Sequence, residues 1–295
     1  MKILETHIVP TLQKKIRLQE YAVDIFKSIP SRSGIKKAIK RVEILIDGQI
    51  AKTSDWIKEG QKIELLQQEI KPKKIFRLKL EIIFEDDYFA VVIKLPGYPT
   101  SGNYFKTLEN ALPFNLKISE EPDALPYPLP VHRLDNPTGG LLLIAKTRFA
   151  QTKLYQAFET KEIEKTYTAL VQGTTPETAI FQDEIDQKTA STKIQTLSSF
   201  SFKNENFSLV EVNPDTGRTH QIRIHLSQHG FPIVGDKEHG TSSEPFLKKG
   251  LYLAAIGLRL KHPITDKPLE FKMKIPHRFE ISRELKSMLS DNKNS

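Results

Sequence analysis

HRLDNPTGGLLLIAKT, residues 132–147, places a histidine, an arginine and an aspartate directly before an uninterrupted apolar run. The run Leu141–Ala145 is short and wholly apolar, which predicts a central strand buried on both faces of a sheet. Asp135 lies on the turn before it. A carboxylate so close to a core loses hydration unless a cation compensates, and such groups often act as nucleophiles or bases. The alternative is that Arg133 and Asp135 only order a turn shaped by Pro137 and two glycines.

A second segment, PDTGRTHQIRIHLSQHGFPIVGD (214–236), concentrates arginine and histidine. Thr219 can cap a helix here, and the Gly-Phe-Pro sequence near the end can terminate it. Helical spacing places Arg223 on an apolar face, where a cation requires a buried anion, and Asp135 is the candidate. Strand spacing would instead group Arg223 with His225, but the end signals favour the helix.

The remaining pattern predicts an α+β fold with a largely antiparallel sheet, because strands mostly follow one another with only occasional helices. Residues 110–130 hold five prolines and are expected to be mostly loop. Other expected elements are two strands within 80–100, a helix at RFAQTKLYQAF, strands at KTYTALVQG, FSLVEVNP and LYLAAIGLRL, a helix over 278–289 and a disordered tail, DNKNS.

The net positive charge of the chain comes from its first quarter. Residues 1–80 contain 18 Lys and Arg against 9 Asp and Glu, a net charge of +9, whereas all 295 residues together carry +8. A basic segment attached to a nearly neutral body suggests that the first segment binds a polyanion, although a solvated lysine-rich face would look the same. The chain has no cysteine and no apolar run long enough to span a membrane, so we expect a cytoplasmic protein.

Residues 11–70 read as a small α/β module. A first helix ends near Pro30, a second begins at Ser31 or Ser33, and VEILIDGQI predicts a hairpin with Val42 in its first strand and an Asp47-Gly48 turn. Another strand is expected after Gly60. The second helix exposes basic side chains suited to phosphates: Arg32, Lys36, Lys37, Lys40 and Arg41. Its SRSGIKKAIKR core resembles the alpha-L RNA-binding motif, and residues 71–79 read as a basic linker.

The sequence contains little evidence for other classes of catalytic or cofactor site. His225 and His229 have helical i, i+4 spacing, but no HExxH pattern or cysteine supplies further ligands, so no metal is expected. No G-x-S-x-G motif marks a serine nucleophile, and no glycine pattern marks a nucleotide site.

The quoted segments together resemble the RluA-type pseudouridine synthases. HRLDNPTGGLLLIAKT is similar to that family's H-R-L-D catalytic motif, and TGRTHQIR to its T-G-R-x-H-Q-[IL]-R helix. Similar correspondences hold for FEDDYFAVVIKLPGYPT, EKTYTALVQG, KTASTKIQTL and LKHPITDKPLEF. The resemblance implies the pseudouridine synthase fold over residues 80–290. It also implies a cofactor-free isomerase that acts on ribosomal or transfer RNA, as a monomer.

The resemblance also implies roles for individual residues. Asp135 would be the catalytic aspartate and Arg223 its ion-pair partner. Tyr167 would stack on the target base and assist proton removal from its carbon 5, and Arg133 would fill the space vacated by the flipped nucleotide. Two further residues would line the base pocket, Ile222 and Leu253.

The sequence departs from the family pattern at two places. The usual T-S-G is Thr138-Gly139-Gly140, and the usual L-H-A is Leu253-Ala254-Ala255. Two rival functions remain at this stage: an RNA-binding protein without catalysis, and a hydrolase that uses Asp135 to release a free base. The sequence does not identify the target RNA or its uridines.

Overall fold

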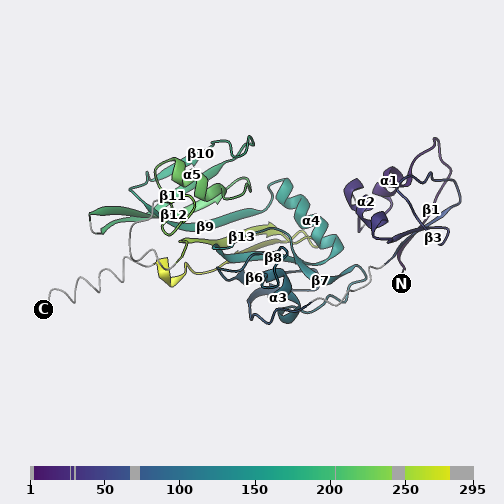
Figure 1. Cartoon of the computed structure of the whole chain (residues 1–295), viewed down its shortest axis with the longest axis horizontal. Helices are drawn as coiled ribbons and strands as arrows, with labels where there is room; N and C mark the ends of the chain where they lie inside the picture. The colour runs from purple at the N-terminus through teal and green to yellow at the C-terminus, as the bar shows by residue number, and fades with distance from the viewer. Residues whose placement is uncertain are drawn as a thin grey trace.

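The computed structural model describes residues 3–26, 28–29, 31–66, 74–202, 204–240 and 250–279. Two sheets organise these residues, a four-stranded one near the N-terminus and a ten-stranded one after it (Figure 1). The ten-stranded sheet has strands in the order β10-β11-β12-β9-β13-β8-β6-β5, with β14 added to β13 and β7 to β8. Only β13 and β8 pair in parallel, so the sheet is mixed and largely antiparallel, as predicted.

The body of the protein contains most of the regular structure. Its strands are β5 (Glu81–Glu85), β6 (Phe89–Lys94), β7 (Ala124–Pro130), β8 (Gly139–Thr147), β9 (Glu164–Gln172), β10 (Thr178–Phe181), β11 (Thr192–Phe202), β12 (Glu205–Pro214), β13 (Leu253–Lys261) and β14 (Pro268–Lys272). Its helices are α3 (Leu108–Asn115), α4 (Arg148–Glu159), α5 (Gln221–Gln228) and the 3-10 turn η3 (His277–Phe279).

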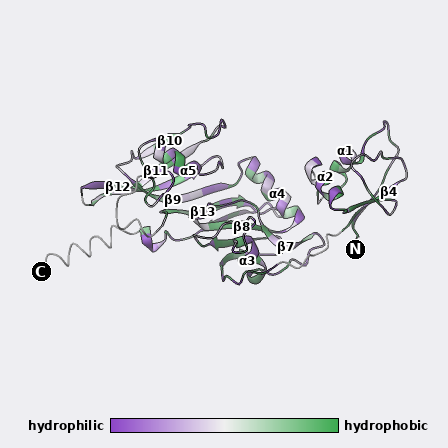
Figure 2. Cartoon of the chain, in the orientation of Figure 1, coloured by the Kyte–Doolittle hydropathy of each residue, from purple (hydrophilic) through white to green (hydrophobic). Residues whose placement is uncertain are grey.

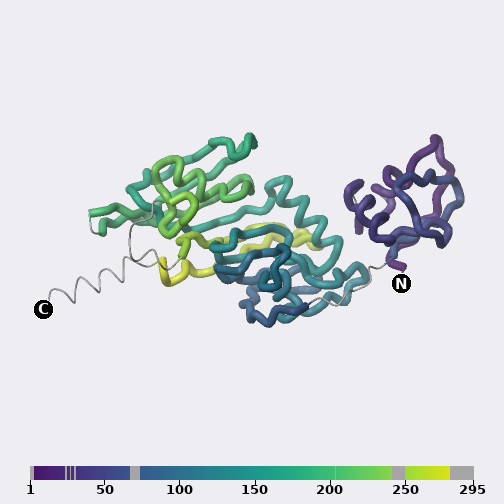
Figure 3. The backbone as a smooth tube through the Cα atoms, in the orientation of Figure 1, coloured from purple at the N-terminus to yellow at the C-terminus, as the bar shows by residue number. Residues whose placement is uncertain are grey.

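Strand β8 is the central strand that the apolar run predicts. Every one of its residues is buried, and hydrophobic residues gather where β8 and α3 lie (Figure 2). The strand pairs with β6 on one side and with β13 on the other. Strand β13, from late in the chain, therefore lies between strands that come earlier in the sequence (Figure 3). Its two faces contribute to separate apolar clusters. The turn that carries Asp135 is thereby attached to the most enclosed strand of the molecule.

Gly140 allows the close parallel contact between β8 and β13. Its φ of +123° is one that side-chain-bearing residues rarely adopt, and a Cβ there would lie 2.1 Å from the carbonyl oxygen of Ala255. Glycine at this position therefore fixes how close the Asp135 turn comes to β13, where Leu253 lies.

The N-terminal module has its own apolar cluster and sheet. Its strands are β1 (Ile3–Ile8), β2 (Ile44–Ile46), β3 (Gln49–Ile50) and β4 (Lys62–Leu66), and its helical segments are α1 (Leu18–Tyr21), η1 (Ala22–Asp24) and α2 (Arg32–Lys40). Strand β1 pairs with β4, so the sheet includes residues before the expected start at 11.

Several expectations for the module are met and others are not. Ser31 caps α2 by accepting from the amide of Gly34, and Asp47 and Gly48 adopt the positive φ of a hairpin turn. Val42 is not in the strand, because it has φ of 63° and is exposed. The first helix is shorter than predicted, a single turn of α-helix followed by a 3-10 turn.

The proline-rich segment was predicted wrongly as loop. It contributes α3, with Pro113 inside the helix, and β7, which contains three of the prolines. Strand β7 pairs only with part of β8, so its prolines interrupt no second ladder. In the expected linker, residues 74–79 have no helix or strand, yet Phe76 and Leu78 pack against the body. Residues 71–73, nearly all of the expected helix over 278–289 and the DNKNS tail lie outside the described residues.

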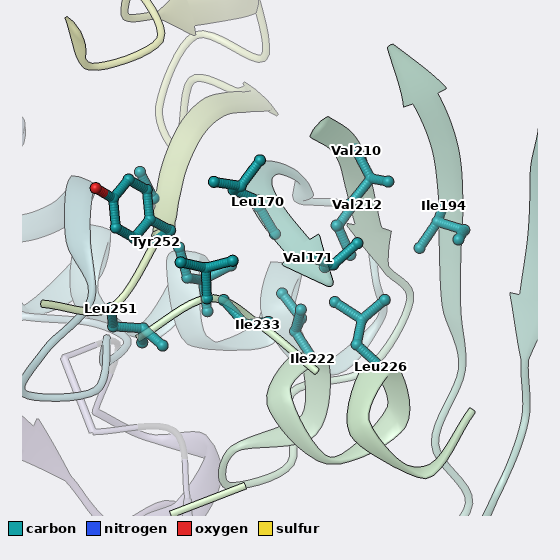
Figure 4. Close-up of a cluster of buried hydrophobic side chains, with 14 of the residues drawn as sticks. Leu170, Val171, Ile194, Val210, Val212, Ile222, Leu226, Ile233, Leu251 and Tyr252 are labelled. Atoms are coloured by element: carbon teal, nitrogen blue, oxygen red, sulfur yellow. The ribbon is translucent and has the colours of Figure 1, made fainter. Parts of the chain in front are cut away.

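Helix α5 packs its apolar side against the sheet. Ile222 and Leu226 project from the helix toward side chains of β9 and β12, including Val171 and Val212 (Figure 4). This packing fixes the rotation of α5 about its axis and hence the direction of Arg223.

Candidate active site

A cavity of about 1270 Å³ opens between the turn before β8, strand β9 and the segment leading into α5. Residues singled out from distant parts of the sequence meet in its wall. The six predicted catalytic-domain site residues all line it: Arg133, Asp135, Tyr167, Ile222, Arg223 and Leu253. The site residues predicted from separate motifs therefore share one cavity.

The turn that presents Asp135 is held by its neighbours. Thr100 Oγ1 donates to the carbonyl oxygen of Leu134 and accepts from the Leu134 amide, at 2.9 and 3.1 Å. The amide of Gly97 donates to the carbonyl oxygen of Asn136 at 2.8 Å. These contacts come from the loop after β6, so a segment 34 to 39 residues earlier in the chain fixes the backbone beside Asp135.

Lys94, at the end of β6, is fully buried beneath the same turn. Its Nζ lies within hydrogen-bonding distance of the carbonyl oxygens of Thr138 (2.7 Å), Asp135 (3.1 Å), Asn136 (3.2 Å) and Leu95 (3.3 Å). Burial lowers the pKa of Lys94 to about 8, although the negative charge of Asp135 opposes this change. The ammonium thus holds together the carbonyls of the turn, a role that the sequence did not suggest.

We expect the rate of the reaction at this cavity to fall as pH rises through about 8, the pKa of Lys94, because a neutral amine holds the carbonyls of the Asp135 turn less well. Lys94→Met should lower kcat by ~10–100-fold, as displacement of a catalytic group does. Its pH profile should also lack the fall in kcat above about pH 8, the alkaline limb of the wild-type profile. The measurement is kcat against pH.

Two controls test whether the alkaline fall in kcat comes from the geometry of the Asp135 turn or from unfolding. The folded pKa of Lys94 lies below its ordinary 10.5, so between those values the unfolded chain binds more protons. This group therefore makes folding more favourable as pH rises, and thermal melts should show no loss of stability due to it. Lys146→Met removes another buried ammonium, at the far end of β8, and should keep the limb. A limb that persists in Lys94→Met would assign it to another group.

Arg223 has a different main partner from the one predicted. Its Nε and Nη2 donate to both carboxylate oxygens of Asp236, at 2.7 and 2.6 Å, and Asp236 is 1% exposed. Asp135 Oδ2 lies 3.7 Å from Nη1 of Arg223, which is an ion pair without a hydrogen bond. The predicted ion pair between Arg223 and Asp135 is therefore present, but Asp135 is not the buried anion: Asp236 neutralises the arginine, and Asp135 faces its remaining nitrogen.

Charge and burial oppose each other at this pair. Burial alone disfavours ionisation of Asp236, but hydrogen bonds from Arg223 and from the amides of Glu238 and His239 outweigh it, so its pKa is lowered. Burial likewise opposes the charge of Arg223, but Asp236 outweighs it and raises the pKa of the guanidinium. Nη1 is buried and has no hydrogen-bond partner among the described residues. It is therefore a buried donor without a hydrogen-bond acceptor, and it faces Asp135.

The turn before α5 is built differently from the predicted Thr219 cap. His220 precedes the helix in a left-handed conformation, with φ of 54°, and no side chain caps it. Instead the buried Gln221 accepts from the amide of Arg218 and the hydroxyl of Thr216, at 3.0 and 2.6 Å. The same side chain donates to Ser191 and Thr192. Gln221 therefore joins this turn to β11.

Tyr167 lies on β9 with its ring between two apolar clusters and on the cavity wall. Burial, and then the negative charge of Asp135, raise the pKa of its hydroxyl well above the usual range. The phenol is therefore neutral at physiological pH and can donate a hydrogen bond.

Two neighbours of Asp135 differ sharply in exposure. Arg133 is exposed at the cavity. The ring of His132 turns inward, where its Nε2 accepts from the amide of Leu143, and burial followed by the charge of Lys165 lowers its pKa to about 3. His132 is thus a neutral structural acceptor, and Arg133 is the long, flexible cation at the opening.

The two histidines that suggested a metal by their spacing do not converge. His225 is buried and contacts Thr192 and the carbonyl oxygen of Asp183, whereas His229 pairs with the Asp183 carboxylate and stacks on Phe181.

The basic helix α2 exposes Lys36, Lys37 and Lys40. The two flanking arginines have carboxylate partners: Arg32 pairs with Glu20 at 2.8 Å and Arg41 with Glu43 at 2.7 Å. The three lysines are thus the better candidates for phosphate contacts.

Comparison with known proteins identifies the family. The sequence profile described as RNA pseudouridylate synthase matches residues 88–228, which include the Asp135 turn and α5. An uncharacterized RNA pseudouridine synthase of Aquifex aeolicus (strain VF5) is 30% identical, covering 95% of this chain and 96% of that protein. The chain belongs to the RluA-type RNA pseudouridine synthases.

Other relatives of this pseudouridine synthase agree. The ribosomal large subunit pseudouridine synthase D of Vibrio cholerae (serotype O1) is 28% identical over 92% of this chain and 91% of its own. The solved structure of human RNA Pseudouridylate Synthase Domain Containing 1 is 26% identical, with a TM-score of 0.55 over 67% of this chain and 84% of that one. The synthase is therefore an isomerase that acts on RNA. In the part of the chain that the structure describes, no helix is long and apolar enough to cross a membrane.

Proposed function

We propose that this synthase isomerises specific uridines of ribosomal RNA, with Asp135 as the catalytic group and the target base flipped into the cavity. The observation that carries the assignment of Asp135 is its place in the cavity wall, 18% exposed and 3.7 Å from a buried guanidinium. Such a carboxylate is accessible to a substrate and faces a fixed positive charge, an arrangement common among catalytic carboxylates.

The reaction suits this set of residues. Isomerisation breaks the bond between N1 of uracil and the ribose, turns the base, and forms a bond from carbon 5 to the same sugar carbon. Atoms and electrons balance within the nucleotide, so no oxidant or group carrier takes part. The carboxylate can attack the sugar, attack the base, or abstract a sugar proton, and each route requires ionised Asp135. The enclosing wall also retains the detached uracil.

The neighbouring residues receive roles from their positions. Arg133 reaches from the exposed edge of the cavity and would fill the space left by the flipped nucleotide. Ile222 and Leu253, both nearly buried, would form the apolar wall of the base pocket. The unpaired Nη1 donor of Arg223 faces Asp135 and would help to orient its carboxylate.

Tyr167 is proposed to stack on the uracil. Tyr167→Phe should retain this contact, whereas Tyr167→Ala should weaken substrate interaction by roughly 1–3 kcal/mol, the usual cost of losing an aromatic platform. Measured kcat and KM on one RNA separate two roles for the residue. A Phe variant that binds normally but turns over slowly would show that the hydroxyl takes part in the reaction. Equal behaviour of the Phe and Ala variants would exclude stacking.

Ribosomal RNA is proposed as the substrate because relatives from Vibrio cholerae and Rickettsia felis are named ribosomal large subunit pseudouridine synthases. The test is a pseudouridine map of total RNA from cells with and without the gene. Loss of particular sites in ribosomal RNA supports the proposal. Loss confined to transfer RNA would move the substrate to that class and leave the chemistry unchanged.

The module before residue 71 is proposed to bind RNA phosphates through α2. Replacing Lys36, Lys37 and Lys40 by glutamine should weaken RNA binding and reduce the slope of log affinity against log salt by about 0.7–0.9 for each phosphate that is no longer neutralised. A matched control replaces three exposed lysines of the body that do not line the cavity, Lys261, Lys267 and Lys274. Equal affinities and slopes for both triple variants would show that α2 does not bind RNA.

A further inference from the structure

Three side chains, one in the cavity wall and two beside it, have the composition and spacing of a metal site. His220, Glu238 and His239 each offer one ligand atom, and these atoms lie within 4.8 Å of one another. His220 Nδ1 is 3.1 Å from His239 Nε2 and 3.3 Å from Glu238 Oε2. In a tetrahedral zinc site with bonds of ~2.0–2.1 Å, neighbouring ligand atoms lie ~3.3 Å apart. We propose that these three residues bind a divalent ion of the zinc type, with water as the fourth ligand.

The chain already holds two of the ligands in place. Asp236 Oδ1 accepts from the amides of Glu238 and His239, at 3.0 and 3.1 Å. Ser227 on α5 donates to the carbonyl oxygen of His239 at 2.5 Å. Because Asp236 and Ser227 already fix the backbone of this turn, metal binding requires little further ordering.

The outer atoms of the ligands also have partners of the kind that metal sites use. Glu238 Oε1 lies 3.4 Å from Nη2 of Arg223, so its second oxygen is held away from the site. The other ring nitrogen of His220, Nε2, faces Asp135 Oδ1 at 3.9 Å. Metal-bound histidines commonly direct their second N–H at a carboxylate. An ion on Nδ1 would leave the proton on Nε2, directed at Asp135.

The local charge favours a cation. Three carboxylates, Asp135, Asp236 and Glu238, form ion pairs with the single guanidinium of Arg223. Lys94 is the next cation, bonded to the backbone of Asp135. Carboxylates therefore outnumber the cations that contact them, and a divalent ion at His220 would reduce the excess.

The test is a titration of metal-free, untagged full-length protein with Zn²⁺ against a chromophoric chelator, without RNA. We expect one tight site that His239→Ala and Glu238→Gln each weaken by at least ~10–100-fold, the range that loss of an outer partner of a ligand alone produces. His229→Ala removes another accessible histidine, outside the cluster, and should leave the affinity unchanged. Co²⁺ should give the intense visible bands of tetrahedral coordination in the wild type and lose them in His239→Ala.

Two outcomes would overturn the proposal: no stoichiometric Zn²⁺ binding by the wild type, or equal affinity in wild type and His239→Ala. Thermal melts in chelator check that the variants fold. Because the titration contains no RNA and measures no turnover, its failure leaves the proposed role of Asp135 untouched.

Discussion

Replacing Asp135 by asparagine is expected to reduce uridine isomerisation by ~10³-fold or more, as removal of a catalytic nucleophile or base does. The change is nearly isosteric, and the side chain is partly exposed and forms no hydrogen bond with Arg223. Folding and RNA affinity should therefore stay close to those of the wild type. Release of tritium from carbon 5 of labelled uridine measures the first effect, and filter binding of the same RNA measures the second.

The same cavity offers a matched control. Asp215 also lines it and pairs with Lys193 and Ser191 rather than with Arg223. Asp215→Asn should keep isomerisation within ~10-fold of the wild type. Normal tritium release by Asp135→Asn would exclude it as the catalytic group, and free uracil among the wild-type products would indicate hydrolysis in place of isomerisation.

The sequence predicts the elements whose pattern is local. The apolar run at 141–145 indicated β8, the end signals around 219–232 indicated α5, and both are found. The prolines of residues 110–130 led to a wrong prediction of loop. A strand tolerates proline on an edge that forms no ladder, and sequence alone does not reveal which edge of β7 is paired.

The partners of the site residues were also harder to predict, because they too depend on contacts between segments that lie far apart in the sequence. A buried arginine at 223 required an anion, and the sequence offered Asp135 by motif, whereas Asp236 makes the two hydrogen bonds. Asp236 follows Gly235, which has a positive φ in the turn after α5. That glycine was the sequence signal that could have pointed to Asp236. Lys94 was missed because its partners are backbone carbonyls, which carry no sequence signature.

Arg223→Met is expected to lower the free energy of unfolding by ~3–5 kcal/mol, because it leaves the buried carboxylate of Asp236 without its cation. The double variant Arg223→Met/Asp236→Asn should recover much of this loss. Arg223→Met/Asp135→Asn should recover little, because Asp135 is 18% exposed and lies 3.7 Å from the arginine. Denaturant unfolding of the singles and both doubles gives the two coupling energies.

The outcome that contradicts this assignment is equal recovery in the two double variants, which would restore Asp135 as the main partner. The pH dependence supplies an independent check with a definite sign. The pKa of Asp236 is lowered below its ordinary 3.8, since Arg223 and two amides outweigh burial. Its ionisation therefore stabilises the fold fully above that value, and this contribution is lost as pH falls through the lowered folded pKa. The difference in unfolding free energy between the wild type and Asp236→Asn should accordingly shrink in acid. If Arg223 instead paired mainly with Asp135, Asp236→Asn would keep the acid dependence of the wild type.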